Sequence, residues 1–225
     1  YEELVAFIER VSAVGVRSFA IHARKAWLTG LSPKENREIP PLDYPRVHRL
    51  KRDFPHLEIA INGGVLTLEV ARKQLDHVDG VMIGRAAQGR PWIFREIAHF
   101  LDTGEELPPP LVTEIHQVLL EHLHALYAFY GRDTGVRIAR KHISWYTKGL
   151  ANSASFRHMM NRLESCEQQL AAVDAFFLQV GQQALRLQYE SEDGTSADSI
   201  SVASSSGEGA SEGALAHAPA RALAA

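Results

Sequence analysis

Three short apolar segments of this chain are each followed by residues that could bind an anion. The segment at residues 16–23 carries His22 and Arg24 near its end. These side chains are two positions apart, so they would point the same way from an extended strand and could donate to an electron-rich ring or an anion. The other two segments, at 57–61 and 80–83, run into glycine turns. The turn residues are Asn62, Gly63 and Gly64 after the second segment, and Gly84 and Arg85 after the third.

Glycine turns expose backbone N–H groups that no Cβ shields, and such groups can cradle a phosphate. A guanidinium beside these donors adds charge-assisted hydrogen bonds. Taken singly, each turn could be a plain tight turn, and His22 could be a strand-end histidine with a structural partner. Two such turns on successive segments together favour a phosphorylated ligand.

The secondary-structure elements that must position these turns are predicted to be alternating helices and strands. Apolar spacing predicts helices at 1–15, 45–53, 66–75 and 91–101, and strands at the three apolar segments. The alternating order predicts parallel strands with helical crossovers, whose ligands bind at the carboxyl ends of the strands. Rossmann-like sheets and (β/α)8 barrels both satisfy this order. Three units do not close a barrel, so either the sheet is open or the first units are missing.

The second half of the chain differs in composition. Residues 102–110 read as a linker after the α/β part at 1–101, and residues 111–186 contain only helical patterns, at 111–130, 133–149, 154–164 and 165–184. This favours a small helical bundle. The last part, 187–225, is rich in Ser, Ala and Gly and is predicted to be a disordered tail.

Basic residues gather in two places. Within the long polar connection at 24–41, Lys25, Lys34 and Arg37 surround Trp27, a mixture that suits an RNA backbone and stacked bases. The stretch at 137–148 holds four Lys or Arg residues and no acid. An unpaired basic face on a nearly neutral protein favours a polyanionic partner, although either stretch could also be a solvated surface.

Composition excludes several classes of protein. The chain has 225 residues, 45% of them hydrophobic and 23% charged, which is typical of a globular protein. Apolar runs fall well short of the ~18 residues that a membrane span needs. With Cys166 as its single cysteine the chain forms no internal disulfide, which fits a reducing cytosol. The histidines at 116, 122 and 124 lack zinc-site spacing, so no metal site is predicted.

The motifs resemble one enzyme family. The run HARKAWLTGLSPKENR at 22–37 closely resembles tRNA-dihydrouridine synthases of the A-type subfamily. The run MIGRAAQGRPWIF at 82–94 and the helical stretch RIARKHISWY at 137–146 resemble the B-type subfamily instead. The resemblance covers about residues 1–185.

The resemblance implies a fold and an activity. The fold would be the last three β/α units of an FMN-binding TIM barrel, followed by the helical bundle and tail. The activity would be reduction of the C5–C6 bond of specific uridines in tRNA, with NADPH as the reductant acting through FMN. His22 would contact the flavin, and Asn62, Gly63, Gly64, Gly84 and Arg85 would bind its phosphate. The residues expected to contact tRNA are Arg24, Lys34, Arg37, Arg137, Arg140 and Lys141.

The resemblance also implies what this chain lacks. In the family a cysteine on an earlier barrel strand donates the proton, and a lysine on another strand contacts the flavin; neither motif is present here. Because the chain also starts at Tyr1 without a methionine, we expect a carboxy-terminal fragment that is inactive and poorly stable alone. The whole enzyme would be a cytoplasmic monomer. A non-catalytic RNA-binding module and a small-molecule flavin oxidoreductase are the alternative interpretations.

Overall fold

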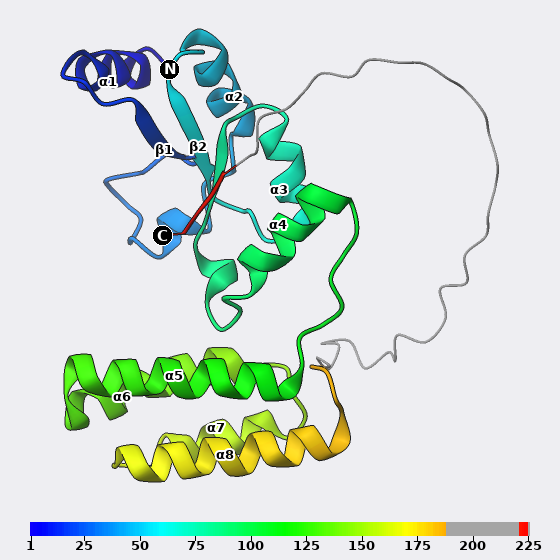
Figure 1. Ribbon diagram of the computed structural model, residues 1–225. Coiled ribbons are helices and arrows are strands. Elements are labelled where there is room, and N and C mark those ends of the chain that lie inside the picture. Colours follow the sequence, from blue (N-terminus) through cyan, green and yellow to red (C-terminus); the bar gives the residue numbers. More distant parts are fainter. Residues whose placement is uncertain (188–220, 225) are drawn as a thin grey trace, which may run out of the picture. The chain divides into compact units, whose positions relative to one another are not determined.

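The computed structural model describes residues 1–187 and 221–224 (Figure 1). The chain divides into two compact units. Among the described residues, the first unit comprises 1–107 together with the strand at 221–224, and the second comprises 108–187. The boundary between Leu107 and Pro108 lies inside the predicted linker at 102–110.

The first unit is a parallel α/β structure. Its sheet has the order β1-β2-β3-β4, and its strands are β1 (Ser18–His22), β2 (Glu58–Asn62), β3 (Gly80–Ile83) and β4 (Arg221–Ala224). Helical crossovers connect the first three strands, as the alternating pattern predicts. The helices are α1 (Glu2–Ala13), α2 (Tyr44–Asp53), α3 (Leu68–Leu75) and α4 (Ile93–Thr103), with short 3-10 helices η1 (Glu35–Arg37) and η2 (Arg85–Ala87).

The core of this unit follows from the apolar strands. On β2 the consecutive residues Ile59, Ala60 and Ile61 are all buried, because a central parallel strand is covered on both faces. Val81 and Ile83 of β3 are buried beside them, and Ile8 of α1 joins the same core. On β1 buried and exposed residues alternate, as expected of a strand that is covered on one face.

Side-chain caps set where two crossover helices begin. Asp43 precedes α2 and accepts a hydrogen bond from the N–H of Arg46, and Thr67 does the same for Val70 at the start of α3. Helix α4 differs from the prediction at both ends. It begins at Ile93, so Pro91 lies before the helix, and it continues into the predicted linker until Gly104 ends it in the left-handed conformation.

The end of the chain also differs from the prediction. Residues Arg221–Ala224 form β4, which pairs in parallel with β3, whereas the composition predicted a disordered tail over 187–225. Leu187, the first residue of that tail, is buried, and its N–H donates to the carbonyl of Pro110. Average composition does not reveal such residues, because a short strand needs only a free backbone edge on its neighbour and a single buried residue needs only one apolar contact. The rest of the predicted tail lies outside the described residues.

The second unit consists of helices. They are α5 (Val112–Tyr130), α6 (Arg132–Thr147), α7 (Ser153–Met160) and α8 (Cys166–Gln183), all close to the predicted positions (Figure 1). Leu119 and Leu123 of α5 and Val173 of α8 are fully buried, and α5 packs against both α6 and α8. No helix of the described residues is long and apolar enough to cross a membrane.

One buried polar network joins three of these helices. The hydroxyl of Tyr127 on α5 donates to Oε1 of Gln169 on α8, over 2.9 Å, and Nε2 of Gln169 donates to the carbonyl of Val136 on α6, over 3.1 Å. Both polar side chains are thereby satisfied, and burial raises the pKa of Tyr127 well above its ordinary value.

Candidate functional site

The carboxyl ends of β1, β2 and β3 meet at one pocket. All six residues predicted to bind the cofactor line it: His22, Asn62, Gly63, Gly64, Gly84 and Arg85. Strand register explains this convergence, because His22 pairs with Asn62 and Asn62 pairs with Met82 in adjacent strands. The turns that follow the strands therefore gather at the same edge of the sheet, where ligands of parallel α/β folds bind.

A chain of hydrogen bonds orients His22. Nδ2 of Asn62 donates to the carbonyl of Met82 at 2.9 Å, and this turns Oδ1 of Asn62 toward the histidine. Nδ1 of His22 lies 2.7 Å from that oxygen. Since an amide oxygen only accepts, Nδ1 must carry the proton, which leaves Nε2 for a ligand.

The turn after β2 requires both of its glycines. Gly63 and Gly64 have φ values of +106° and +70°. A Cβ on Gly64 would lie 2.4 Å from Leu42 Cδ1 and 2.6 Å from the hydroxyl of Tyr44. That hydroxyl donates to the carbonyl of Gly63 at 3.0 Å and so holds the turn. The turn thus offers bare backbone to the pocket.

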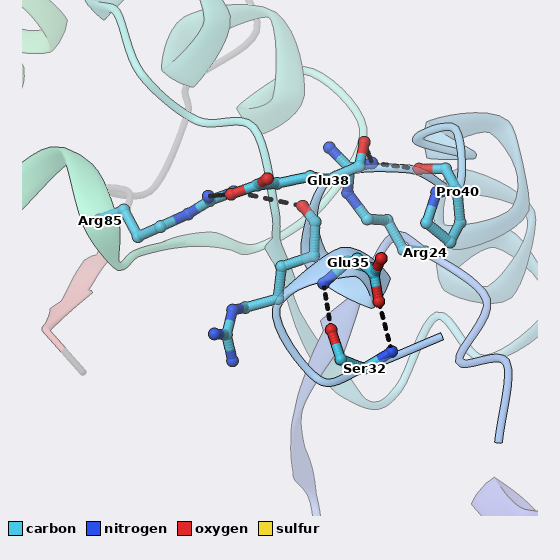
Figure 2. A network of polar contacts seen from close by, with 7 residues as sticks. Arg24, Ser32, Glu35, Glu38, Pro40 and Arg85 are labelled. Carbon is cyan, nitrogen blue, oxygen red and sulfur yellow. Dashed lines mark hydrogen bonds and ion pairs between the residues drawn. The ribbon is translucent and has the colours of Figure 1, made fainter. Parts of the chain in front are cut away.

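Arg85 is held by the loop between β1 and α2 (Figure 2). Its guanidinium lies 3.4 Å from a carboxylate oxygen of Glu38 and donates to the carbonyl of Arg37 at 3.3 Å. Both charged side chains of the ion pair are about half exposed, so the pair is weak. An incoming phosphate could therefore replace the carboxylate of Glu38.

Arg37 also lines this pocket, although its sequence position predicted an RNA contact. Its side chain is exposed, and within residues 1–187 and 221–224 its guanidinium forms no ion pair. Two arginine residues, Arg37 and Arg85, therefore line the pocket. Sequence reasoning missed this because the two residues are far apart in the chain and only the folded loop brings them together.

Arg24 does not point with His22, and the expectation of a shared direction is wrong. Strand β1 ends at His22, and the N–H of Arg24 donates to the carbonyl of His22 at 2.8 Å. This three-residue turn interrupts the alternation of the strand. The guanidinium of Arg24 instead donates to the carbonyls of Glu38 and Pro40 and closes the base of the loop (Figure 2).

The loop itself is internally ordered. Oγ of Ser32 accepts from the N–H of Glu35, and a carboxylate oxygen of Glu35 accepts from the N–H of Ser32 (Figure 2). These reciprocal bonds form a capping box and lower the pKa of Glu35. The Ser-x-x-Glu spacing at 32–35 could have revealed it in the sequence. Lys34 lies inside the box and is exposed.

The basic stretch at 137–148 forms part of α6 in the second unit. Arg137 and Lys141 are exposed, and Nζ of Lys141 lies 5.6 Å from the centre of the Trp145 ring. Arg140 is partly buried and donates to the carbonyl of Leu163, between α7 and α8, at 2.9 Å. Two of the three predicted RNA contacts on this helix are therefore available to a partner, whereas Arg140 supports the fold.

Among the described residues, no group of three or more His, Cys, Asp or Glu side chains could hold a metal ion. His116 bonds to Asp174 at 2.7 Å, and His122 lies 3.3 Å from the hydroxyl of Tyr146. Cys166 is buried, and its thiol lies 3.8 Å from the carbonyl of Arg132.

The fold and the pocket define a parallel α/β protein with a pocket at the carboxyl edge of its sheet, joined to a helical unit. Residues 1–181 match the family model described as dihydrouridine synthase (Dus). The chain therefore belongs to the dihydrouridine synthase family, whose curated members named below are tRNA-modifying oxidoreductases.

Relatives of two names are similar to this chain. It is 42% identical over 182 residues to tRNA-dihydrouridine synthase B of Pseudomonas putida, covering 80% of this chain and 50% of the relative. It is 50% identical over 159 residues to tRNA-dihydrouridine(20/20a) synthase of Escherichia coli K12, covering 64% of this chain and 46% of that protein. The tRNA-dihydrouridine(20/20a) synthase of Vibrio cholerae is 62% identical over 98 residues, covering 43% of this chain and 30% of that protein. The chain thus spans about half the length of such relatives.

Proposed function

We propose that this chain is the carboxy-terminal portion of an FMN-dependent, NADPH-driven tRNA-dihydrouridine synthase. Its first unit would be the last three β/α units of a TIM barrel, and its second unit the tRNA-binding helical bundle. The observation that carries the proposal is the convergence of the six candidate residues on one pocket at the strand ends. The whole enzyme would act in the cytoplasm as a monomer.

The pocket residues fit the phosphate of FMN. Arg37 and Arg85 supply positive charge, and the turn at Gly63 and Gly64 supplies bare backbone that a Cβ would block. His22, oriented by Asn62, would direct Nε2 toward the flavin. A phosphate would exchange the weak pairing of Arg85 with Glu38 for charge-assisted bonds to both guanidiniums.

When bound, FMN supplies the hydride, taken from NADPH, that saturates one carbon of the uracil C5–C6 bond. The neighbouring carbon needs a proton from an acid. Cys166 does not supply it, because its thiol is buried at the start of α8 and faces the carbonyl of Arg132. We infer that the acid belongs to the part of the enzyme that this chain does not span.

Two surfaces would contact RNA, the loop at 24–41 in the first unit and one face of α6 in the second. Lys34, Arg137 and Lys141 are exposed cations that could contact phosphates without rearrangement. Arg37 would serve the cofactor pocket rather than tRNA, and Arg24 and Arg140 would support the fold.

Titration of FMN into the 225-residue chain tests the proposal. We expect binding that quenches flavin fluorescence, and an affinity at least tenfold lower in the Arg85→Ala variant, which loses one charge-assisted contact. Arg72→Ala removes an exposed arginine of α3 outside the pocket and should bind FMN like the parent chain.

Two results would contradict the proposal. FMN binding that Arg85→Ala leaves unchanged would mean that the pocket is not the phosphate site. A folded chain that binds tRNA but not FMN would favour the RNA-binding module instead.

A further inference from the structure

The loop between β1 and α2 exposes two large apolar side chains. Trp27 is 58% exposed and Leu28 is 93% exposed, whereas Trp92 in the same unit is 8% exposed. A tryptophan usually buries most of its surface, so an adjacent exposed pair on a loop marks a surface that a partner covers.

The backbone under Trp27 is held in place. Its N–H donates to Oδ1 of Asn36 at 2.7 Å, and its carbonyl accepts from Nδ2 of Asn36 at 2.9 Å. Nδ2 of Asn36 also lies within 3.3 Å of the carbonyls of Leu31 and Ser32. One amide therefore ties the two sides of the loop together, and the backbone that carries the indole is fixed before any partner binds.

The charges around the indole favour RNA over an apolar protein surface. Apart from Arg37, which lines the cofactor pocket, the exposed cations of the loop are Lys25 and Lys34. Of its two carboxylates, Glu35 is engaged in the capping box, and Glu38 forms a weak ion pair with Arg85. An exposed aromatic side chain on a loop that also carries two exposed lysines matches a stacked base and its phosphates.

We propose that Trp27 and Leu28 form a stacking platform for an unpaired nucleobase of the RNA substrate, with Asn36 as its positioning residue. This inference rests on the proposed function, because it takes the RNA to be the partner. The ordered loop lowers the entropic cost of binding, since the backbone of Trp27 is already fixed.

The test measures binding of an unmodified tRNA transcript and of an oligouridylate to the 225-residue chain. We expect Trp27→Ala to weaken binding about tenfold, which is the loss typical of one stacked base. Phe7→Ala is the matched control, because Phe7 of α1 is an aromatic side chain with the same 58% exposure. It should bind RNA like the parent chain.

Two further variants separate stacking from folding. Trp27→Phe keeps an aromatic ring, so RNA binding should be restored, while the quenching of tryptophan fluorescence by bound RNA should lose the part that Trp27 contributes and keep any part from Trp92 and Trp145. Asn36→Ala keeps the indole but frees its backbone, and binding should weaken severalfold while the fluorescence change persists. Far-UV circular dichroism should be the same for all variants.

Three outcomes would overturn the platform. One is equal RNA affinity of Trp27→Ala and the parent chain, which would leave the synthase proposal intact. Another is equal weakening by Trp27→Ala and Phe7→Ala. The third is a parent chain that binds FMN but binds neither the tRNA transcript nor the oligouridylate. If the parent chain binds neither FMN nor RNA, the proposed function fails as well.

Discussion

Nδ1 of His22 on β1 and Oδ1 of Asn62 on β2 lie 2.7 Å apart, across a pair of residues in register. The same amide of Asn62 donates to the carbonyl of Met82 on β3. One side chain thus links the ends of three strands and sets which nitrogen of His22 carries the proton. The relationship connects the sheet register to the chemistry of the pocket.

Replacing Asn62 with alanine should therefore affect both FMN binding and stability. The variant loses two hydrogen bonds, so we expect the free energy of unfolding to fall by about 1–2 kcal/mol. His22 also loses its orienting partner, and FMN affinity should fall about tenfold. Denaturant unfolding and flavin titration measure the two effects. Asn161→Ala, at an exposed position after α7, should change neither; an unchanged FMN affinity in Asn62→Ala would refute the role given to this amide.

Gly64→Ala and Gly104→Ala should lower the free energy of unfolding by different amounts, although the two glycines have similar φ values. The φ values are +70° and +75°, so both variants pay about 1–2 kcal/mol for the left-handed conformation. A Cβ at Gly104 meets nothing within 4 Å, whereas one at Gly64 meets Leu42 and Tyr44. We expect Gly64→Ala to lose roughly 1–3 kcal/mol more, through overpacking. Thermal unfolding of both variants measures the difference. Equal losses of stability would show that the side chains of Leu42 and Tyr44 move aside without a loss of stability.

Alanine variants of Arg140 and Arg137 should have different effects, the first on the stability of the helical unit and the second on RNA binding. Arg140→Ala leaves the carbonyl of Leu163 without its donor, and we expect a loss of about 1–3 kcal/mol in the helical unit. Arg137 is exposed, so Arg137→Ala should change stability by less than about 0.5 kcal/mol but weaken RNA binding and reduce its salt dependence. Urea unfolding followed by helical circular dichroism, with RNA titrations at two salt concentrations, tests both variants. A stable Arg140→Ala variant would contradict the structural role.

Acid should destabilise the helical unit through His142. Burial, and then the charges of His122 and Lys141, lower the pKa of His142 to about 4. The unfolded chain takes up this proton near pH 6.5, but the folded unit does not until about pH 4. Stability is therefore at its full value above pH 6.5 and declines as the pH falls toward 4. Burial also lowers the pKa of His122, which adds to the decline.

The measurement is the unfolding temperature of the helical unit at pH 7 and pH 5. His142→Gln removes the titrating group, so the difference between the two temperatures should shrink. His158→Gln, at an exposed position on α7, is the control and should keep the difference of the parent chain. An unchanged difference in His142→Gln would assign the acid sensitivity to other groups.

Local patterns predicted the elements that form the pocket. The glycine turns at 63–64 and 84 directly follow apolar strands. The carboxyl ends of neighbouring parallel strands lie at the same edge of the sheet, so these turns come together at the pocket. For the same reason the sequence alone predicts that Asn62 and Arg85 lie at this edge of the sheet. The helices of the second unit were also predictable, because each has its own apolar spacing and its own breaker.

The tertiary structure decided which cations face the pocket, the solvent or the fold. Arg24, Arg37 and Arg140 look alike as basic residues in polar stretches. A turn after β1 directs Arg24 to the carbonyls of its own loop, the folded loop brings Arg37 beside Arg85, and the α7–α8 connection offers Arg140 a carbonyl. A flexible, charged side chain takes its direction from partners distant in the chain, and local periodicity carries no information about them.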